Sequence, residues 1–400
     1  MFAVLDAVLI ALGAVLAVPV LTLCVEIFAA LKRSRGPASA TPQGPRPRLA
    51  VLVPAHDEEA ALARNLKSIL RQLRPGDRLV VVADNCSDAT ARVARQQGAE
   101  VTVRSEAALR GKGYALDHGL AFLAQTGAPE IVVCIDADCE IGPGCIERLA
   151  HACLETRCPA QAAYLMRPAA SPARRSAAII TFAWLVKNYV RPLGLRRMGL
   201  PCQLVGSGMA FLWRDIRSVN LRNANLVEDL SLGLDLALNG TFPRFCPEAI
   251  VLSEVAAGGV PSFAQRARWE HGAIATAMRY APRLARGFCN SRNPCLAAMT
   301  LDLAVPPMAL LTLLLLGHFA AATILYGAGA GAAPLWFATT NGALFLLGTG
   351  AAWRRFGRDV VRLRTLALAP FYVLGKLPLY LRLFVDRQTE WVRGKRGLSA

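Results

Sequence analysis

Long apolar runs alternate with polar stretches along the chain, and their lengths predict different kinds of segment. Residues 1–31 are almost continuously apolar from Phe2 to Leu31, long enough to cross a bilayer as a helix. This run has no basic start and no small-residue cleavage site, which predicts an anchor and not a removed signal peptide. Residues 32–48 are rich in Pro, Gly, Lys and Arg and contain no acid, which predicts a cytoplasmic linker.

Between residues 49 and 285, short apolar runs alternate with segments of helical periodicity. The predicted strands are Leu49–Ala55, Arg78–Asp84, Ala99–Val103 and Ile131–Ile135. The predicted helices are Ala60–Leu73, a short helix capped by Ser87 or Asp88 that ends near Gly98, and Gly113–Gln125. The strands are apolar on both faces, which is typical of a parallel sheet covered by helices. The pattern therefore predicts a Rossmann-like α/β domain with a mostly parallel sheet.

The last hundred residues are again strongly apolar. Within 300–353, two membrane helices are expected at Ala304–Tyr326 and Leu335–Trp353, and the basic residues that follow place both flanks in the cytoplasm. Within 354–400, the apolar segment 365–384 contains two prolines, Lys376 and Arg382, so it is expected to lie in the interface or to re-enter. A full crossing is less favoured, because it would place the basic tail outside.

One earlier segment, at about residues 174–200, combines apolar positions with Arg191, Arg196 and Arg197. This mixture predicts an interfacial helix, with an ordinary basic surface helix as the alternative.

Charge and cysteine content narrow the class of protein. The formal net charge is +17 over 400 residues, of which 54% are hydrophobic. Aromatic residues are few and no motif that reads a nucleic-acid groove is present, so no nucleic-acid partner is expected. Arginines beside apolar segments instead favour a bilayer with an anionic cytoplasmic leaflet. The 11 cysteines form no CxxC pair, which argues against a zinc site and favours a reducing compartment.

Two aspartates follow the buried run in the stretch IVVCIDADCE (residues 131–140). Residues two apart in a strand point the same way, so Asp136 and Asp138 are expected together at the carboxyl edge of the sheet. Open α/β sheets bind their ligands at that edge. Two close carboxylates repel each other unless a cation lies beside them, and Mg²⁺ or Mn²⁺ with substrate phosphates suits this arrangement. Asp-x-Asp alone is also common in turns; its position after a buried strand favours the metal.

Other polar positions also lie at strand ends or helix starts. The stretch VPAHDEE ends the first predicted strand, and Asp84 ends the second strand at the same sheet edge. Lys112 lies in a glycine-flanked loop at a helix start, where N–H groups and an ammonium can meet phosphate, although Gly-Lys-Gly is often only a flexible turn. Gly206 and Ser207 lie in VGSGMAFLW, whose glycines permit close approach of a ligand.

Two further helices carry the remaining candidates. Glu228 and Asp229 fall in the first turn of a helix, where carboxylates also complement the helix dipole without any catalytic role. Gln265, Arg268 and Trp269 are spaced i, i+3 and i+4 and so share a helix face, as they also would in a packed amphipathic helix.

In this order, the six stretches resemble the family 2 glycosyltransferases of the GT-A fold. The most similar subset is membrane-bound and includes cellulose, hyaluronan and chitin synthases and ceramide glucosyltransferase-like enzymes. The resemblance covers about Leu49–Trp269, and QRARW matches the QxxRW signature of that subset, together with DAD and ED. It implies a GT-A domain over residues 49–285 that includes the interfacial helices.

The resemblance also implies roles for individual residues. Asp84 would contact the uracil of a UDP-sugar in a pocket lined by Pro54, Ala55 and Glu58, and Lys112 would steady the nucleotide or its diphosphate. Asp136 would face the ribose or the metal, and Asp138 would ligate the metal. Asp229 would be the general base, with Glu228 beside it in the catalytic site. The diphosphate and the acceptor sugar would be held by Gly206, Ser207, Gln265, Arg268 and Trp269.

The expected protein is thus a multi-pass inner (plasma) membrane enzyme with a cytoplasmic catalytic domain. It would move a sugar from a UDP-sugar to a glycan or lipid-linked acceptor and form a β-linkage in exopolysaccharide or glycolipid synthesis. Three expected spans are few for a polymer channel, which favours adding one or a few sugars. A processive polysaccharide synthase, with a homo-oligomer forming the channel, is the alternative. A non-catalytic nucleotide-sugar-binding subunit of a polysaccharide export complex and a transporter are less favoured.

Overall fold

The computed structural model describes residues 2–32, 42, 44–167, 175–222, 227–254 and 263–385, and the chain forms two compact units. The helical unit consists of Met1–Arg33, Ala170–Gly199 and Gly258–Gln388. The sheet unit consists of the described parts of Ser34–Ala169 and Leu200–Ala257. The interfacial segment at about 174–200 and the helix of the QRARW stretch therefore group with the terminal helices.

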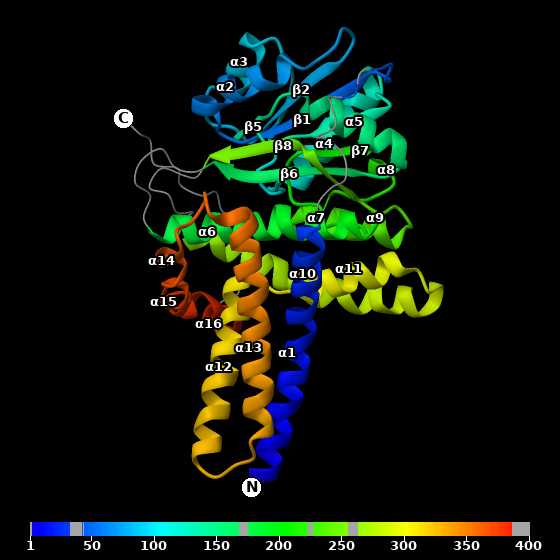
Figure 1. Cartoon of the computed structure of the whole chain (residues 1–400). Helices are drawn as coiled ribbons and strands as arrows, with labels where there is room; N and C mark the ends of the chain where they lie inside the picture. The colour runs from blue at the N-terminus through cyan, green and yellow to red at the C-terminus, as the bar shows by residue number, and fades with distance from the viewer. Residues whose placement is uncertain are drawn as a thin grey trace. The chain divides into compact units, whose positions relative to one another are not determined.

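The sheet unit contains one eight-stranded sheet in the order β3-β2-β1-β4-β7-β6-β8-β5 (Figure 1). Its strands are β1 (Leu49–Ala55), β2 (Arg78–Asp84), β3 (Glu100–Arg104), β4 (Ile131–Cys134), β5 (Cys139–Ile141), β6 (Ala160–Arg167), β7 (Met209–Leu212) and β8 (Arg244–Glu254). Strands β1 to β4 pair in parallel, and β6 pairs in parallel with β8. Strand β7 pairs antiparallel with β4 and β6, and β5 pairs antiparallel with β8. The predicted α/β architecture with a mostly parallel sheet is confirmed.

Helices follow the strands, and the sequence pattern predicts the first three of them and the one that begins with Glu228 and Asp229. They are α2 (Glu59–Leu70), α3 (Thr90–Gln96), α4 (Lys112–Thr126), α5 (Cys145–Thr156), α8 (Trp213–Ile216) and α9 (Glu228–Leu238). Residues of α4 and α9 share one buried core with strands β1, β2, β4 and β7; Leu116, Leu236, Leu52 and Phe211 belong to it. Burying each such side chain stabilises the fold by about 1.5–3 kcal/mol. This packing sets the starts of α4 and α9 beside the strand ends, where the candidate site lies.

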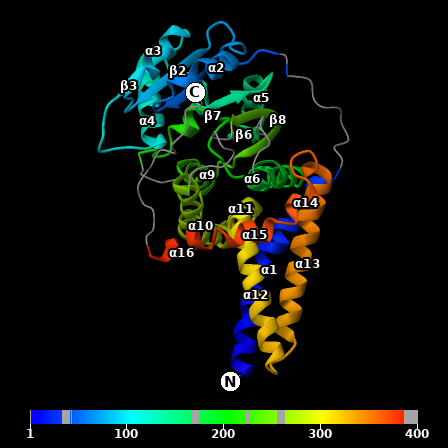
Figure 2. The same ribbon diagram turned by 90° about the vertical axis from the view of Figure 1, so that its left-hand side faces the viewer.

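In the ranges that the structure describes, the long apolar helices all belong to the helical unit. Its elements are α1 (Phe2–Leu31), α6 (Arg175–Leu185), the π-helical turn η1 (Val186–Val190), α7 (Arg191–Arg197), α10 (Phe263–Ser291), α11 (Pro294–Ala304), α12 (Met308–Gly327), α13 (Ala333–Ala352), the π-helical turn η2 (Trp353–Gly357), α14 (Leu363–Leu366), α15 (Ala369–Leu374) and α16 (Leu377–Val385). Helices α1, α12 and α13 lie side by side in both ribbon views (Figures 1 and 2). Two buried side chains join them: His318 Nε2 bonds Leu9 O at 3.0 Å, and Asn341 donates to Gly13 O at 2.8 Å.

Among the described residues, two helices are long and apolar enough to cross a membrane, α1 and α12. The segment Leu335–Trp353, expected as a further span, forms most of α13 but does not reach the same hydropathy. Polar residues explain the difference, because Thr339, Thr340, Asn341 and Thr349 interrupt its apolar sequence.

Segment 365–384 does not form one continuous helix. It is broken into α14, α15 and α16, and Pro370 and Pro378 each stand second in a new helix. Proline fits the first turn of a helix but disrupts a helix interior, so a new helix begins at each of these points. This arrangement excludes a single spanning helix over the segment.

Arg191, one of the basic residues of the predicted interfacial helix, is not exposed. Its guanidinium is buried and donates to Glu26 Oε2 of α1 at 2.6 Å and to Asp302 Oδ1 of α11 at 2.5 Å. The approach of α7 to α1 also depends on Gly194, because a Cβ there would lie 1.9 Å from Glu26 O. The sequence pattern missed this because both acidic partners are more than a hundred positions away.

Candidate active site at the carboxyl edge of the sheet

Lys112 is the centre of a charged cluster in the sheet unit. Its ammonium Nζ lies 2.5 Å from Asp136 Oδ1, 3.9 Å from Glu228 Oε1 and 2.6 Å from the carbonyl oxygen of Gly206. Lys112 opens α4, Asp136 follows β4 and Glu228 opens α9, so three separate elements supply the charges. The shared core beneath α4, β4 and α9 explains why these groups meet.

Gly206 lies in the middle of this cluster and cannot be replaced without strain. Its φ of +96° is in the region that favours glycine. A Cβ there would lie 3.2 Å from Asp229 Oδ2, 3.8 Å from Lys112 Nζ and 3.9 Å from Asp136 Oδ2. The absence of a side chain therefore leaves space toward which two carboxylates and one ammonium converge.

Ser207 fixes the backbone beside the cluster. It is fully buried, and its Oγ accepts a hydrogen bond from the backbone N–H of Asp136 at 3.0 Å. The Ser207 carbonyl accepts a bond from buried Gln161 of β6 at 2.9 Å. Ser207 therefore lies behind Asp136, where its hydrogen bonds hold the loop.

Asp136 and Asp138 offer a pair of hard oxygen ligands. One ligand atom from each, together with Cys139 Sγ, lies within 4.8 Å of the others. Burial, followed by the charges of Asp138 and Asp136, raises the pKa of the Cys139 thiol well above its usual range, so this sulfur stays protonated. Two carboxylates without a thiolate match the preferences of Mg²⁺ or Mn²⁺, and the residues fit the expected metal.

Burial shapes the protonation of this cluster. Burial and the adjacent Asp229 raise the pKa of Glu228 to about 7, against the opposing effect of Lys112. Burial alone would lower the pKa of Lys112, but Asp136, Glu228 and Asp229 outweigh it and keep the pKa above its ordinary value. Lys112 is therefore a permanent cation, and Glu228 is poised to exchange a proton near neutral pH.

Asp84 ends β2 at the same sheet edge but already has a strong partner. Its Oδ1 accepts a bond from Arg104 Nη1 at 2.6 Å, and both side chains are buried. Strands β2 and β3 are in parallel register with Asp84 opposite Arg104. The sequence pattern did not single out Arg104; opposite charges at the ends of two consecutive strands were the available signal.

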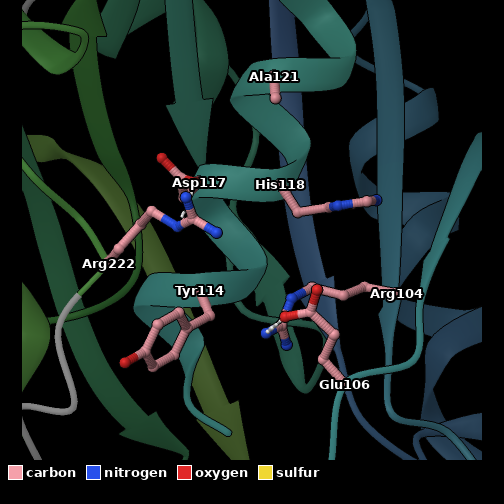
Figure 3. A pocket seen from close by; sticks show the side chains of 7 residues that line it. All are labelled: Arg104, Glu106, Tyr114, Asp117, His118, Ala121 and Arg222. Atoms are coloured by element: carbon pink, nitrogen blue, oxygen red, sulfur yellow. Dashed lines mark hydrogen bonds and ion pairs between the residues drawn. The ribbon is translucent and has the colours of Figure 1, made fainter. Parts of the chain in front are cut away.

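A pocket of about 220 Å³ lies next to this ion pair (Figure 3). It is lined by Arg104, Glu106, Tyr114, Asp117, His118, Ala121 and Arg222. Arg104 also donates to Glu106 at 2.9 Å and lies over the Tyr114 ring at 5.4 Å. Arg104 therefore connects Asp84 to a polar hollow on α4.

Pro54, Ala55 and Glu58 lie at the end of β1, next to β2. In parallel register, Pro54 is opposite Val82 and Ala55 is opposite Ala83, one position before Asp84. The backbone N–H of Glu58 donates to Thr90 Oγ1 of α3 at 2.7 Å. The structure thus brings the expected nucleotide-pocket residues to the same edge as Asp84.

Arg268 and Trp269 lie in α10 of the helical unit, and the side chain of Gln265 lies outside the described residues. The Trp269 ring packs against Trp184 of α6, with ring centroids 5.5 Å apart and an interplanar angle of 50°. Arg268 and Trp269 lie on a helix, as their spacing predicts. The charged cluster around Lys112 consists of candidates in the sheet unit.

The family follows from sequence comparison. Residues 45–272, more than half of the chain, match the model for "Glycosyltransferase like family 2". The chain belongs to this family of glycosyltransferases. No curated protein sequence matches the chain.

Solved structures share the fold at low sequence identity. The mannosyltransferase PcManGT from Pyrobaculum calidifontis, solved with GDP-Man and Mn²⁺, is 20% identical, with a TM-score of 0.55 over 96% of this chain and 100% of that one. Glucosyl-3-phosphoglycerate synthase from Mycobacterium tuberculosis, solved with Mn²⁺, UDP and phosphoglyceric acid, is 22% identical, with a TM-score of 0.39 over 60% and 78% of the two chains. The first likeness supports a GT-A-like α/β fold.

Proposed function

We propose that the protein is a membrane-bound inverting glycosyltransferase that moves a sugar from a UDP-sugar to a glycan or lipid-linked acceptor. The new bond is a β-linkage, made at the cytoplasmic face of the inner membrane in exopolysaccharide or glycolipid synthesis. The observation that carries the proposal is the convergence of Lys112, Asp136 and Asp229 around Gly206. The two helices long and apolar enough to cross a bilayer, α1 and α12, support the membrane location.

In this proposal the donor binds along the sheet edge. Asp84 accepts a hydrogen bond from the uracil, and Pro54, Ala55 and Glu58 line the nucleotide pocket. Lys112 binds the diphosphate and stabilises the negative charge that develops as UDP leaves. A divalent ion held by Asp136 and Asp138 would supply further charge neutralisation at the diphosphate.

The acceptor reacts from the opposite side of the sugar. Asp229 takes the proton of the acceptor hydroxyl as the new bond forms, while Arg268 and Trp269 hold the diphosphate and the acceptor sugar. A single displacement inverts the anomeric carbon, so a UDP-α-sugar gives a β-linkage. No second carboxylate is needed as an acid, because the leaving diphosphate departs as an anion.

The test is transfer by the purified full-length protein in detergent micelles and in native membranes. A panel of UDP-sugars, with GDP-mannose as the matched alternative, is incubated with membrane lipid and oligosaccharide acceptors. Acceptor-dependent UDP release and a product with a β-anomeric NMR signal are expected. Release of GDP only would overturn the donor assignment. Long product ladders would favour the processive alternative, and UDP binding without any release would favour the non-catalytic binding subunit.

A further inference from the structure

In the helical unit, contacts made by residues before and after Arg268 and Trp269 hold the first turns of α10 in place. Directly after Trp269, the Glu270 carboxylate receives two charge-assisted contacts from the C-terminal helices. Lys376, between α15 and α16, places its Nζ 2.6 Å from Glu270 Oε1, and the hydroxyl of Tyr380 in α16 donates to Glu270 Oε2. The side chains of Glu270 and Lys376 are 13% and 12% exposed, so water screens the pair little.

Neighbouring residues strengthen the same junction. His271 is buried, and its Nε2 donates to the carbonyl oxygen of Leu379 in α16 at 2.9 Å. On the preceding turn, Ala267 is buried together with Leu379 and Tyr380. Half-buried side chains of α12 pack against this cluster. Residues before and after Arg268 and Trp269 are therefore fixed to α12 and α16.

We propose that Glu270 is a positioning residue for Arg268 and Trp269, acting through its bonds to Lys376 and Tyr380. The inference rests on the proposed function, in which Arg268 and Trp269 hold the diphosphate and the acceptor. A half-buried carboxylate with two directed donors has one preferred orientation, and Glu270 lies one residue from Trp269 on the same helix turn. Segment 363–385 thus serves the acceptor side of the reaction in addition to packing beside α12.

Two tyrosines of the same segment provide a matched pair of variants. Tyr380→Phe removes the hydroxyl that bonds Glu270, and Tyr372→Phe removes a buried hydroxyl that has no hydrogen-bond partner among the described residues. Both changes keep the aromatic ring, including the Tyr372 ring that lies 5.5 Å from Lys376 Nζ. The pair therefore separates loss of the Glu270 bond from loss of a buried hydroxyl in general.

The first measurement is steady-state transfer by the full-length protein in micelles. Tyr380→Phe and Glu270→Gln are expected to lower kcat/KM for the acceptor by about tenfold to a hundredfold, the effect of losing a hydrogen bond to a charged group. The KM for the donor should rise less than the KM for the acceptor, because Arg268 is one of several groups that hold the diphosphate and the others belong to the sheet unit. Lys376→Arg, which keeps the charge, should retain most of the activity, and Tyr372→Phe should behave as wild type.

The second measurement does not require turnover. Hydrogen exchange of the amides at residues 267–272 should be faster in Tyr380→Phe than in wild type and unchanged in Tyr372→Phe. Equal exchange and equal acceptor kinetics in the two tyrosine variants would overturn the positioning role. If wild type transfers no sugar from any donor, the proposed function fails, and the exchange result alone decides whether Glu270 orders this turn.

Discussion

The ammonium of Lys112 lies 2.5 Å from Asp136, and the same ammonium faces Glu228 at 3.9 Å. One permanent cation therefore balances the carboxylate that follows β4 and the carboxylate that opens α9, which would otherwise repel each other at the sheet edge. The arrangement holds the acidic groups close together before any donor arrives. A diphosphate that enters this site meets the cation together with the backbone turn at Gly206.

Lys112→Met should weaken UDP binding by about tenfold to a hundredfold, because the diphosphate loses a charge-assisted partner and meets uncompensated carboxylates. Isothermal titration of UDP in the presence of Mn²⁺ measures the change. Lys67→Met, a change in α2 of the sheet unit, is the control and should bind UDP as wild type does. Unchanged UDP affinity in Lys112→Met would refute the role of Lys112 at the diphosphate.

Asp229→Asn should abolish transfer while UDP binding persists, because the amide cannot take the proton of the acceptor hydroxyl. General-base removal typically costs about 10²–10⁴-fold in rate. Turnover and UDP titration are measured on the same preparation. If UDP affinity falls in step with turnover, Asp229 is a donor-binding residue and not the base. Full loss in Glu228→Gln with activity retained in Asp229→Asn would move the base to Glu228.

Asp138→Ala should remove the dependence of UDP binding on divalent metal, because only one of the two carboxylate ligands would remain. UDP titrations with Mn²⁺ and with EDTA measure this dependence. Glu155→Ala, at an exposed position of α5 outside the Asp136–Asp138 pair, is the acidic control and should keep the metal dependence. Metal dependence that survives in Asp138→Ala would contradict the metal assignment.

Glu228→Gln should stabilise the protein more at pH 8 than at pH 5. The pKa of Glu228 is raised to about 7 in the folded state, from an ordinary value of 4.5. A carboxyl with a raised pKa contributes stability below its unfolded pKa and loses that contribution as pH rises through about 7. Because a tenfold change in proton affinity corresponds to about 1.4 kcal/mol, the variant should gain a few kcal/mol in free energy of unfolding at pH 8.

Thermal unfolding in micelles with EDTA, at pH 5 and pH 8, checks this difference. Glu155→Gln, at an exposed position of α5, is the control and should show equal effects at both pH values. A Glu228→Gln effect that does not change with pH would mean that Glu228 ionises normally in the fold.

Arg191→Met should destabilise the helical unit by about 3–5 kcal/mol, because it leaves Glu26 and Asp302 buried without their shared cation. The melting temperature in micelles measures the loss. Arg196→Met, at an exposed position of the same helix, should change it little. Equal melting temperatures for the two variants would mean that the buried triad does not hold α1, α7 and α11 together.

Periodicity and local sequence were sufficient for most elements. Strands β1 and β2 and helix α1 have the predicted bounds, because each is a continuous apolar run ended by charge or turn residues. The stretch IVVCIDADCE predicted that Asp136 and Asp138 lie together after β4, and their ligand atoms do lie close to each other. In these cases neighbouring residues alone decide the structure, since a strand places alternate side chains on the same side.

The local pattern could not show which distant residues meet. Arg191 appeared as part of an interfacial helix, but it is buried against Glu26 and Asp302, which come from 165 and 111 positions away. Arg104 was missed as the partner of Asp84, and Lys376 and Tyr380 were not linked to Glu270. Composition and spacing determined the α/β class, the apolar helices and the acidic strand ends. Only tertiary packing decided the partners of each charge, because the cost of burying an ion is recovered when chain folding brings an opposite charge within a few ångströms.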